Sequence, residues 1–104
     1  MLDFLKSIFS PAPTVDLTVI MADKPLLVDV RTPGEFACGH PKGAVNIPLD
    51  RVGASIEKFK GKKNIVVFCR SGNRSSQAKA ILQSMGISNV VDGGPWENVA
   101  QYTN

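Results

Sequence analysis

The sequence predicts a single α/β domain with a mainly parallel central sheet and helices on both faces. Apolar runs typical of strands alternate along the chain with segments of helical periodicity. The length of 104 residues suits one domain, and a composition of 43% hydrophobic and 20% charged residues excludes a mainly disordered chain. In a sheet of this kind, ligands bind at the carboxyl ends of the strands.

Residues 1–13 are expected to form a short amphipathic segment ahead of a domain that spans residues 14–104. The apolar residues of positions 1–9 lie close to one helical stripe, and a Ser-Pro-Ala-Pro run then breaks the pattern. A helix of this length is marginal in water, so we expect it to dock on its own domain. A membrane surface or a partner protein is the alternative docking site.

Two strands and a short helix are expected in the first half of the domain. Residues 15–21 form a short strand or helix, and the apolar run at 26–30 is typical of a strand covered on both faces. A helix begins within residues 32–36 and ends before the glycine-containing run at 39–43. Residues 44–47 form the second strand.

A helix and the central strand follow. Apolar residues recur every three to four positions at 50–59, with Asp50 as the expected N-cap and Gly61 just beyond the end. Residues 64–68 are β-branched or aromatic apart from the first, which predicts a strand in the middle of the sheet.

The last three elements are a helix, a strand and a helix. Residues 74–85 carry an i, i+3, i+4, i+7 apolar stripe, and Gly86 supplies the left-handed residue that ends the helix. Residues 90–91 form the last strand, and residues 96–102 form a terminal helix.

The loop after the central strand carries the candidate chemistry. Cys69 at its start would face backbone N–H groups and the positive end of a helix, which can lower a cysteine pKa from about 8.5 to about 3.5–7.5. We therefore predict that Cys69 is a thiolate nucleophile; an inert buried cysteine is the alternative. The residues expected to bind an anionic substrate are Arg70, Ser71, Gly72, Asn73, Arg74 and Ser75.

Three motifs of the sequence resemble those of the rhodanese family. They are residues 26–36 with the following Gly-His and Gly-Ala-Val-Asn-Ile-Pro runs, the loop at 69–75, and Asp-Gly-Gly at 92–94 with Trp96. The resemblance covers residues 14–102. It implies a single rhodanese-like domain that acts as a thiosulfate sulfurtransferase.

The resemblance also implies a mechanism. The Cys69 thiolate takes the outer sulfur of thiosulfate or another small anionic donor, sulfite leaves, and the Cys69 persulfide passes its sulfur to an acceptor. Cyanide, a small thiol and a protein cysteine are the candidate acceptors, and no metal or organic cofactor is implied. A persulfide carrier or a binding module without thiosulfate turnover is an alternative function.

A Cys-dependent phosphatase or arsenate reductase is the other alternative. Those enzymes also place a thiolate in an anion-binding loop that ends in arginine, with five residues between the two. Only four residues separate Cys69 from Arg74. Asp92, the candidate general acid, is expected to start the Gly-Gly turn instead.

Five further residues are expected to support the site or the core. Asp29 and Arg31 are predicted to pair and brace the neighbouring loops. We expect His40 to be a structural residue at a helix end, Cys38 and Trp96 to pack, and Cys38 alternatively to resolve the Cys69 persulfide as a disulfide.

The net charge of +3 is too small and dispersed to indicate nucleic-acid binding. The basic cluster at 58–63 is interpreted as a solvated turn before a buried strand. The longest apolar run has about five residues, far below the ~20 that span a bilayer, so no transmembrane helix is expected. Two cysteines and one histidine suit neither a disulfide framework nor a structural zinc site, and we expect a cytoplasmic protein.

Overall fold

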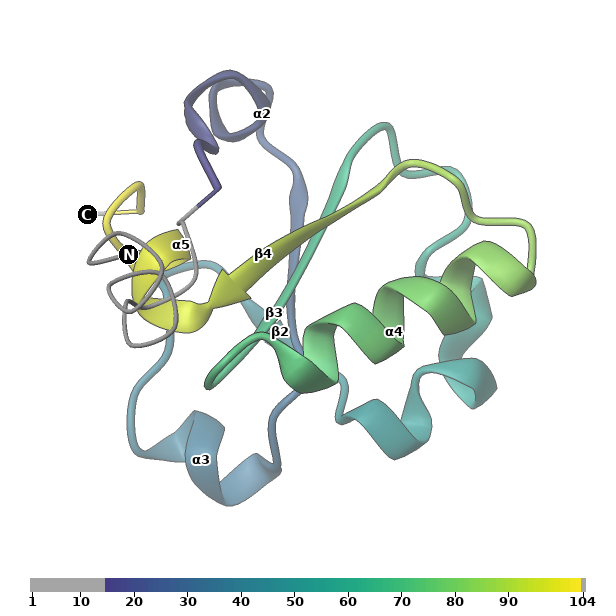
Figure 1. The fold of residues 1–104 in the computed structure, drawn as a ribbon, viewed down its shortest axis with the longest axis horizontal. Helices are drawn as coiled ribbons and strands as arrows, with labels where there is room; N and C mark the ends of the chain where they lie inside the picture. Colours follow the sequence, from purple (N-terminus) through teal and green to yellow (C-terminus); the bar gives the residue numbers. More distant parts are fainter. Residues whose placement is uncertain (1–14, 104) are drawn as a thin grey trace, which may run out of the picture.

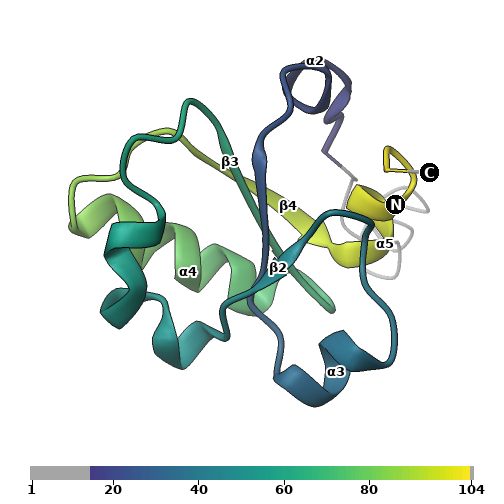
Figure 2. The same ribbon diagram turned by 180° about the vertical axis from the view of Figure 1, so that it is seen from behind.

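The computed structural model describes residues 15–103 and contains a four-stranded parallel sheet with helices on both faces (Figures 1 and 2). The strands are ordered β2-β1-β3-β4. Their bounds are Leu26–Asp29 for β1, Val45–Asn46 for β2, Ile65–Cys69 for β3 and Val90–Pro95 for β4. The predicted fold class is confirmed, and the expected segment at residues 1–13 lies outside the described residues.

Strand β3 is central, as its β-branched composition predicts. It pairs in parallel with β1 through Leu26 and Ile65, and with β4 through Ile65 and Val90. All of its residues are buried. Because its side chains alternate between the two faces, one strand contributes to two separate core clusters.

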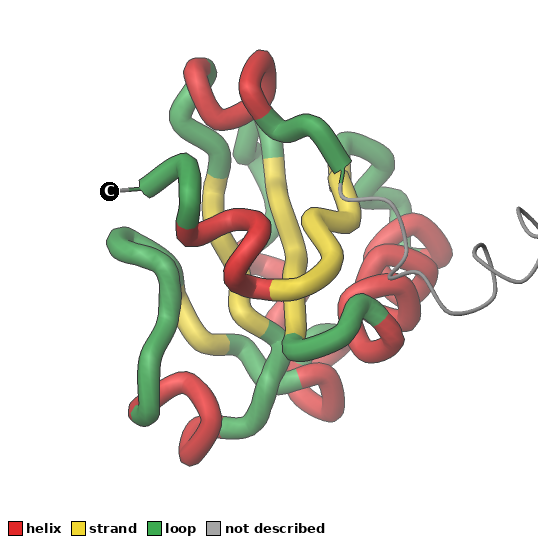
Figure 3. The backbone as a smooth tube through the Cα atoms, turned by 60° about the vertical axis from the view of Figure 1, so that its left-hand side comes forward, coloured by secondary structure: helices red, strands yellow, loops and turns green. Residues whose placement is uncertain are grey.

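The face that receives Ile65, Val67 and Cys69 is covered by helix α4 (Asn73–Ser84) and two 3₁₀ turns, η1 (Leu49–Arg51) and η2 (Gly53–Lys58). The face that receives Val66 and Phe68 is covered by helices α2 (Thr18–Ala22) and α5 (Trp96–Ala100). Figure 3 shows α5 lying in front of the yellow strands. The buried side chains of the first cluster include Val28, Val30, Val52, Phe59, Ala78 and Leu82, and those of the second are Leu17, Leu27, Val66, Phe68 and Val99.

The prediction of an α-helix capped by Asp50 at residues 50–59 is wrong both in the type of helix and in the residue at which it starts. The chain forms the two 3₁₀ turns instead, with Ser55 at φ −106° and ψ 21° between helical residues. Asp50 lies inside η1 and does not cap it; Pro48 occupies the N-cap position. Apolar spacing does not distinguish an α-helix from a 3₁₀-helix over so few residues. With three residues per turn, the 3₁₀ turns also place Val52 and Phe59 in the core.

The remaining elements follow the sequence more closely. The segment at 15–21, for which the sequence allowed a strand or a helix, is helical from Thr18 onward, and α2 extends one residue beyond it to Ala22. Helix α3 (Pro33–Ala37) begins at a capping box between Thr32 and Glu35. Strand β4 continues beyond the predicted residues through an irregularity opposite Val67 and Phe68. The terminal helix α5 ends at Ala100, two residues earlier than expected.

Gly93 in β4 occupies a position that has no room for a side chain. A Cβ atom there would lie 2.9 Å from both Val66 Cγ1 and Val99 Cγ2. The glycine therefore lets α5 pack closely on β3. Among the described helices, none has the length and apolar character that a membrane crossing needs.

Candidate active site

Cys69 is the last residue of β3, at the carboxyl edge of the sheet where parallel α/β sheets bind ligands. Its side chain is fully buried under the loop that leads into α4. Gly72, just before α4, has φ +100°, a left-handed conformation that glycine adopts without steric cost. This turn curls the loop back over the thiol.

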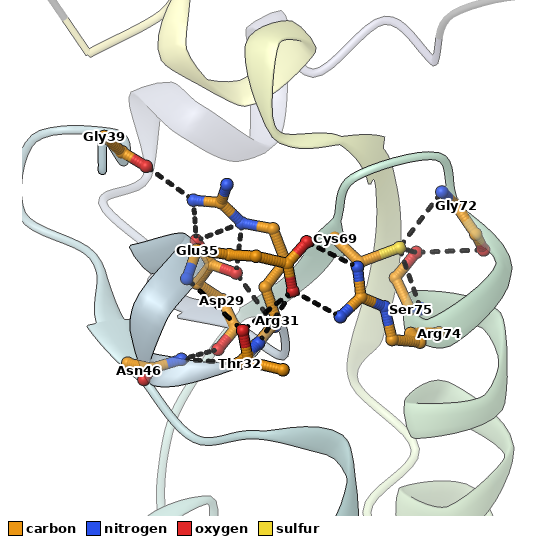
Figure 4. Close-up of polar contacts among 10 residues, drawn as sticks. All are labelled: Asp29, Arg31, Thr32, Glu35, Gly39, Asn46, Cys69, Gly72, Arg74 and Ser75. Atoms are coloured by element: carbon orange, nitrogen blue, oxygen red, sulfur yellow. Dashed lines mark hydrogen bonds and ion pairs between the residues drawn. The ribbon is translucent and has the colours of Figure 1, made fainter. Parts of the chain in front are cut away.

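The loop surrounds the sulfur atom with hydrogen-bond donors (Figure 4). The backbone N–H of Gly72 donates to Cys69 Sγ over 3.0 Å, and the N–H of Ser75 donates over 3.3 Å. The Cys69 thiol lies 3.5 Å from Ser75 Oγ, which itself donates to the Gly72 carbonyl over 3.1 Å. The cradle is thus built from backbone amides and one buried hydroxyl.

These contacts set the acidity of the thiol. Burial is the largest influence and raises the pKa of Cys69, but the hydrogen bond with the Ser75 side chain and those from the Ser75, Gly72 and Ser71 amides together outweigh it. The net result is a Cys69 pKa below that of an ordinary cysteine thiol. The cradle therefore favours the thiolate, the form that acts as a nucleophile.

Arg74 does not point its guanidinium at the sulfur. Its Nη1 and Nη2 donate to Glu35 Oε1 and Oε2 over 2.6 and 2.9 Å, so the pair is bidentate. The Arg74 side chain, followed by the Thr32 backbone N–H, lowers the pKa of Glu35 to about 2. Glu35 in turn raises the pKa of Arg74, and the negative charge of Cys69 adds to that rise.

The other loop side chains lie away from the sulfur. Arg70, Ser71 and Asn73 are exposed. Asn73 accepts a hydrogen bond from Gln77 Nε2 on the first turn of α4, over 3.3 Å. Of the six residues expected to bind an anion, the structure therefore places Gly72 and Ser75 directly on the thiol, and Ser71 contributes through its backbone amide.

A second network braces the ends of β1 and β2. Arg31 and Asp29 form a buried ion pair, with Nη2 and Oδ2 2.7 Å apart, and Arg31 Nη2 also donates to the Gly39 carbonyl over 2.6 Å. Asn46 donates to the carbonyls of Asp29 and Arg31. The guanidinium of Arg31 lies 4.8 Å from the centroid of the Trp96 ring.

His40 and Cys38 lie at the end of α3. The His40 ring stacks on Phe36 at 3.6 Å, and its Nδ1 donates to the Phe36 carbonyl over 2.7 Å, which suits a structural residue. Cys38 is exposed, so the expectation that it packs is wrong. Its place at the exposed C-cap of a five-residue helix explains the difference.

Two cavities flank the Arg74–Glu35 pair. One of about 540 Å³ has Arg74 in its wall, and one of about 400 Å³ has Glu35 in its wall. The smaller cavity also reaches Arg70, the residue that follows Cys69. Within residues 15–103, no three His, Cys, Asp or Glu side chains cluster in a way that could hold a metal ion.

One contact of the site could not be predicted from the sequence. Nothing in the local pattern pairs Glu35 with Arg74, because they are 39 residues apart. Asp92, expected to start a turn, lies instead inside β4 at the irregularity of that strand, where its Oδ1 accepts from the Gly94 N–H over 2.9 Å.

Comparison with known proteins matches residues 15–95 to the model of the rhodanese-like domain. The chain is 35% identical over 99 residues to thiosulfate sulfurtransferase PspE of Escherichia coli K12, covering 93% of each chain. It spans 46% of a longer relative, the senescence-associated protein DIN1 of Raphanus sativus. Among solved structures, human single-domain sulfurtransferase TSTD1 superposes with a TM-score of 0.67 at 26% identity, covering 86% of this chain and 96% of that one. A rhodanese with anions from E. coli gives a TM-score of 0.65 at 38% identity, covering 72% and 91%.

Proposed function

The chain belongs to the rhodanese-like domain family, and we propose that it is a thiosulfate sulfurtransferase that works through a persulfide on Cys69. The observation that carries this proposal is the set of N–H groups that Gly72 and Ser75 direct at Cys69 Sγ. A cradle of this kind stabilises a sulfur anion both before and after sulfur transfer.

In the first half-reaction, the Cys69 thiolate attacks the outer sulfur of thiosulfate. The sulfur–sulfur bond of the donor breaks, sulfite leaves with the bonding electrons, and Cys69 keeps the transferred sulfur as a persulfide. Splitting the transfer into two displacements on one nucleophile is covalent catalysis. The amides of Gly72 and Ser75, which lower the pKa of Cys69, also stabilise the thiolate that attacks the donor.

Access to Cys69 depends on the loop. The residue has 0% exposed surface, so a donor reaches Sγ only when part of the loop between Cys69 and Arg74 moves. Ser71 and Asn73 are exposed and Arg70 lines an open cavity, which leaves this segment free to move on its outer side. Arg70 adds a positive charge beside the path of an anionic donor.

Initial-rate kinetics with thiosulfate and cyanide test the two-step scheme. A Cys69 persulfide that outlives the departure of sulfite gives parallel lines in double-reciprocal plots, the pattern of a ping-pong mechanism. Lines that intersect would require thiosulfate and cyanide to be bound together, which contradicts the persulfide scheme.

The arrangement of Arg74 argues against the phosphatase alternative. An arginine that binds a phosphoryl group must present its N–H donors to the phosphate oxygens. Both terminal nitrogens of Arg74 are instead bound to Glu35. The bidentate pair leaves the loop without the guanidinium that such chemistry uses.

A reducing compartment such as the cytoplasm suits this mechanism. Cys38 and Cys69 are both free in the structure, and a persulfide enzyme needs Cys69 as a thiolate at the start of each cycle. We propose small sulfur anions as donors, and thiophilic small molecules or protein thiols as acceptors.

A further inference from the structure

A small cavity lies against the edge strand β2, with walls separate from those of the Cys69 cradle. Its volume is about 300 Å³, the space of ~10 liquid water molecules, which suits a small organic ligand. None of the residues 69–75 lines it. Its walls include the apolar rings of two prolines and four polar side chains, namely Pro33, Pro48, Asn46, Arg51, Ser55 and Lys58.

The charges in the walls of this cavity are all positive. Arg51 and Lys58 are exposed, and neither has an ion-pair partner within residues 15–103. The acidic residues that precede them along the chain do not compensate, because Asp50 lines the neighbouring cavity of about 540 Å³ and Glu57 pairs with Lys60 over 2.9 Å. An anion in this cavity would therefore meet two unpaired cations and no carboxylate in the walls.

The two 3₁₀ turns bring these cations to the same cavity. Arg51 ends η1 and Lys58 ends η2. Ser55, whose φ of −106° and ψ of 21° interrupt the second turn, lines the cavity with them. Of the basic cluster at 58–63, Lys58 therefore belongs to a defined cavity, whereas Lys60 is held in an ion pair.

Two neutral polar side chains in the walls have hydrogen-bonding capacity that the described residues do not use. Ser55 is bonded through its backbone N–H, which donates to the Val52 carbonyl, so its hydroxyl is available. Asn46 Nδ2 donates to the carbonyls of Asp29 and Arg31 over 2.9 and 3.0 Å, which fixes the carboxamide (Figure 4). Within residues 15–103, Asn46 Oδ1 receives no hydrogen bond. A ligand that fits both groups has an acceptor for Ser55 and a hydroxyl donor for Asn46.

We propose that this cavity binds a phosphate monoester of a small hydroxylated molecule. A phosphate group carries a charge of about −1.5 to −2 at pH 7 and several acceptor oxygens, so it can bind Arg51, Lys58 and the Ser55 hydroxyl together. A single carboxylate would neutralise one of the two cations. A hydroxyl of the ligand donates to Asn46 Oδ1, and its carbon atoms pack against the rings of the two wall prolines. No step of the proposed sulfur transfer uses this cavity, so the inference does not rest on a persulfide at Cys69.

Amide proton–nitrogen NMR spectra of the full chain locate the ligand and give its affinity. Glucose 6-phosphate is the probe, and it is compared with glucose, which lacks the charge, and with inorganic phosphate, which lacks the sugar. We expect glucose 6-phosphate to shift the amide signals of Arg51, Ser55 and Lys58 in a saturable way. Glucose should shift none of them, and inorganic phosphate should bind at the same residues more weakly.

Arg51→Gln and Lys58→Gln test the two cations separately. Each should raise the dissociation constant of glucose 6-phosphate about fivefold, as for the loss of one exposed charge pair. Both residues are exposed, so their replacement leaves the core unchanged, and the dispersion of the same spectra shows whether each variant is folded. Lys62→Gln is the matched control, because it removes the same charge from an exposed residue outside the cavity. It should leave the dissociation constant unchanged.

Three results would overturn this proposal. An equal loss of affinity in Lys62→Gln would show that only the net charge of the protein matters. Signal shifts confined to Gly72, Ser75 and their neighbours would place the phosphate group on the cradle of Cys69 instead. Glucose 6-phosphate that binds no more tightly than inorganic phosphate would refute the assignment of a monoester. None of these measurements involves sulfur transfer, so their outcome is separate from that of the proposed function.

Discussion

Arg74 and Glu35 form a bidentate ion pair that ties the first turn of α4 to helix α3. Arg74 lies two residues beyond Gly72 and next to Ser75, the two residues whose amides contact Cys69 Sγ. The pair therefore anchors the far end of the cradle to a part of the chain that is 39 residues away.

The Glu35→Gln variant tests how much this ion pair stabilises the folded protein. The folded protein holds the pKa of Glu35 at about 2, below its ordinary value of 4.5. The charged carboxylate therefore stabilises the fold above pH 4.5, and this stability is lost as the pH falls from 4.5 toward 2. We expect Glu35→Gln to lower the free energy of unfolding by about 1 kcal/mol at neutral pH, the upper end for a partly exposed pair.

Urea unfolding followed by Trp96 fluorescence at several pH values measures this effect. The difference between the two proteins should shrink below pH 4.5. Glu57→Gln is the matched control, because Glu57 also pairs with a cation but is 79% exposed. A difference that stays the same at every pH would contradict the assignment to this carboxylate.

The Ser75→Ala variant tests the role of the cradle in the acidity of Cys69. Removing the hydroxyl takes away one of the hydrogen bonds that lower the pKa of Cys69, so that pKa should rise. The ultraviolet absorbance of the thiolate, titrated in a Cys38→Ser background, reports the midpoint. In Ser76→Ala, which loses only a hydroxyl bonded to the Asn73 carbonyl, the midpoint should not move.

The Gly93→Ala variant tests the close packing of α5 on the sheet. A Cβ atom 2.9 Å from Val66 and Val99 forces both side chains to shift. Overpacking of this kind costs about 1–3 kcal/mol of stability. Chemical denaturation should show this loss of stability for Gly93→Ala and none for Gly34→Ala, where a Cβ atom would meet nothing within 4 Å. A Gly93→Ala variant as stable as the unmodified protein would contradict the close packing of α5 on the sheet.

Local sequence patterns were sufficient to predict the elements that form from residues close together in the chain. The apolar run of β3, the stripe of α4 and the helix stop at Gly86, which has φ +92°, depend on residues close in sequence. The same holds for the position of Cys69, because the strand and the glycine loop that place it are adjacent.

The details that could not be predicted depend on distant residues or on fine backbone geometry. The 3₁₀ form of η1 and η2 has the same apolar spacing as an α-helix over so few residues. The orientation of Arg74 depends on Glu35, and the exposure of Cys38 follows from its place at the C-cap of the short helix α3. Neither feature leaves a periodic pattern in the sequence.

Intact-protein mass spectrometry after brief incubation with thiosulfate tests the central claim most directly. The unmodified protein and Cys38→Ser should each gain the mass of one sulfur atom, which maps to Cys69 and disappears after a cyanide chase. Cys69→Ser should gain nothing. An adduct that persists in Cys69→Ser, or no adduct on a folded protein with Cys69 intact, would contradict the persulfide mechanism.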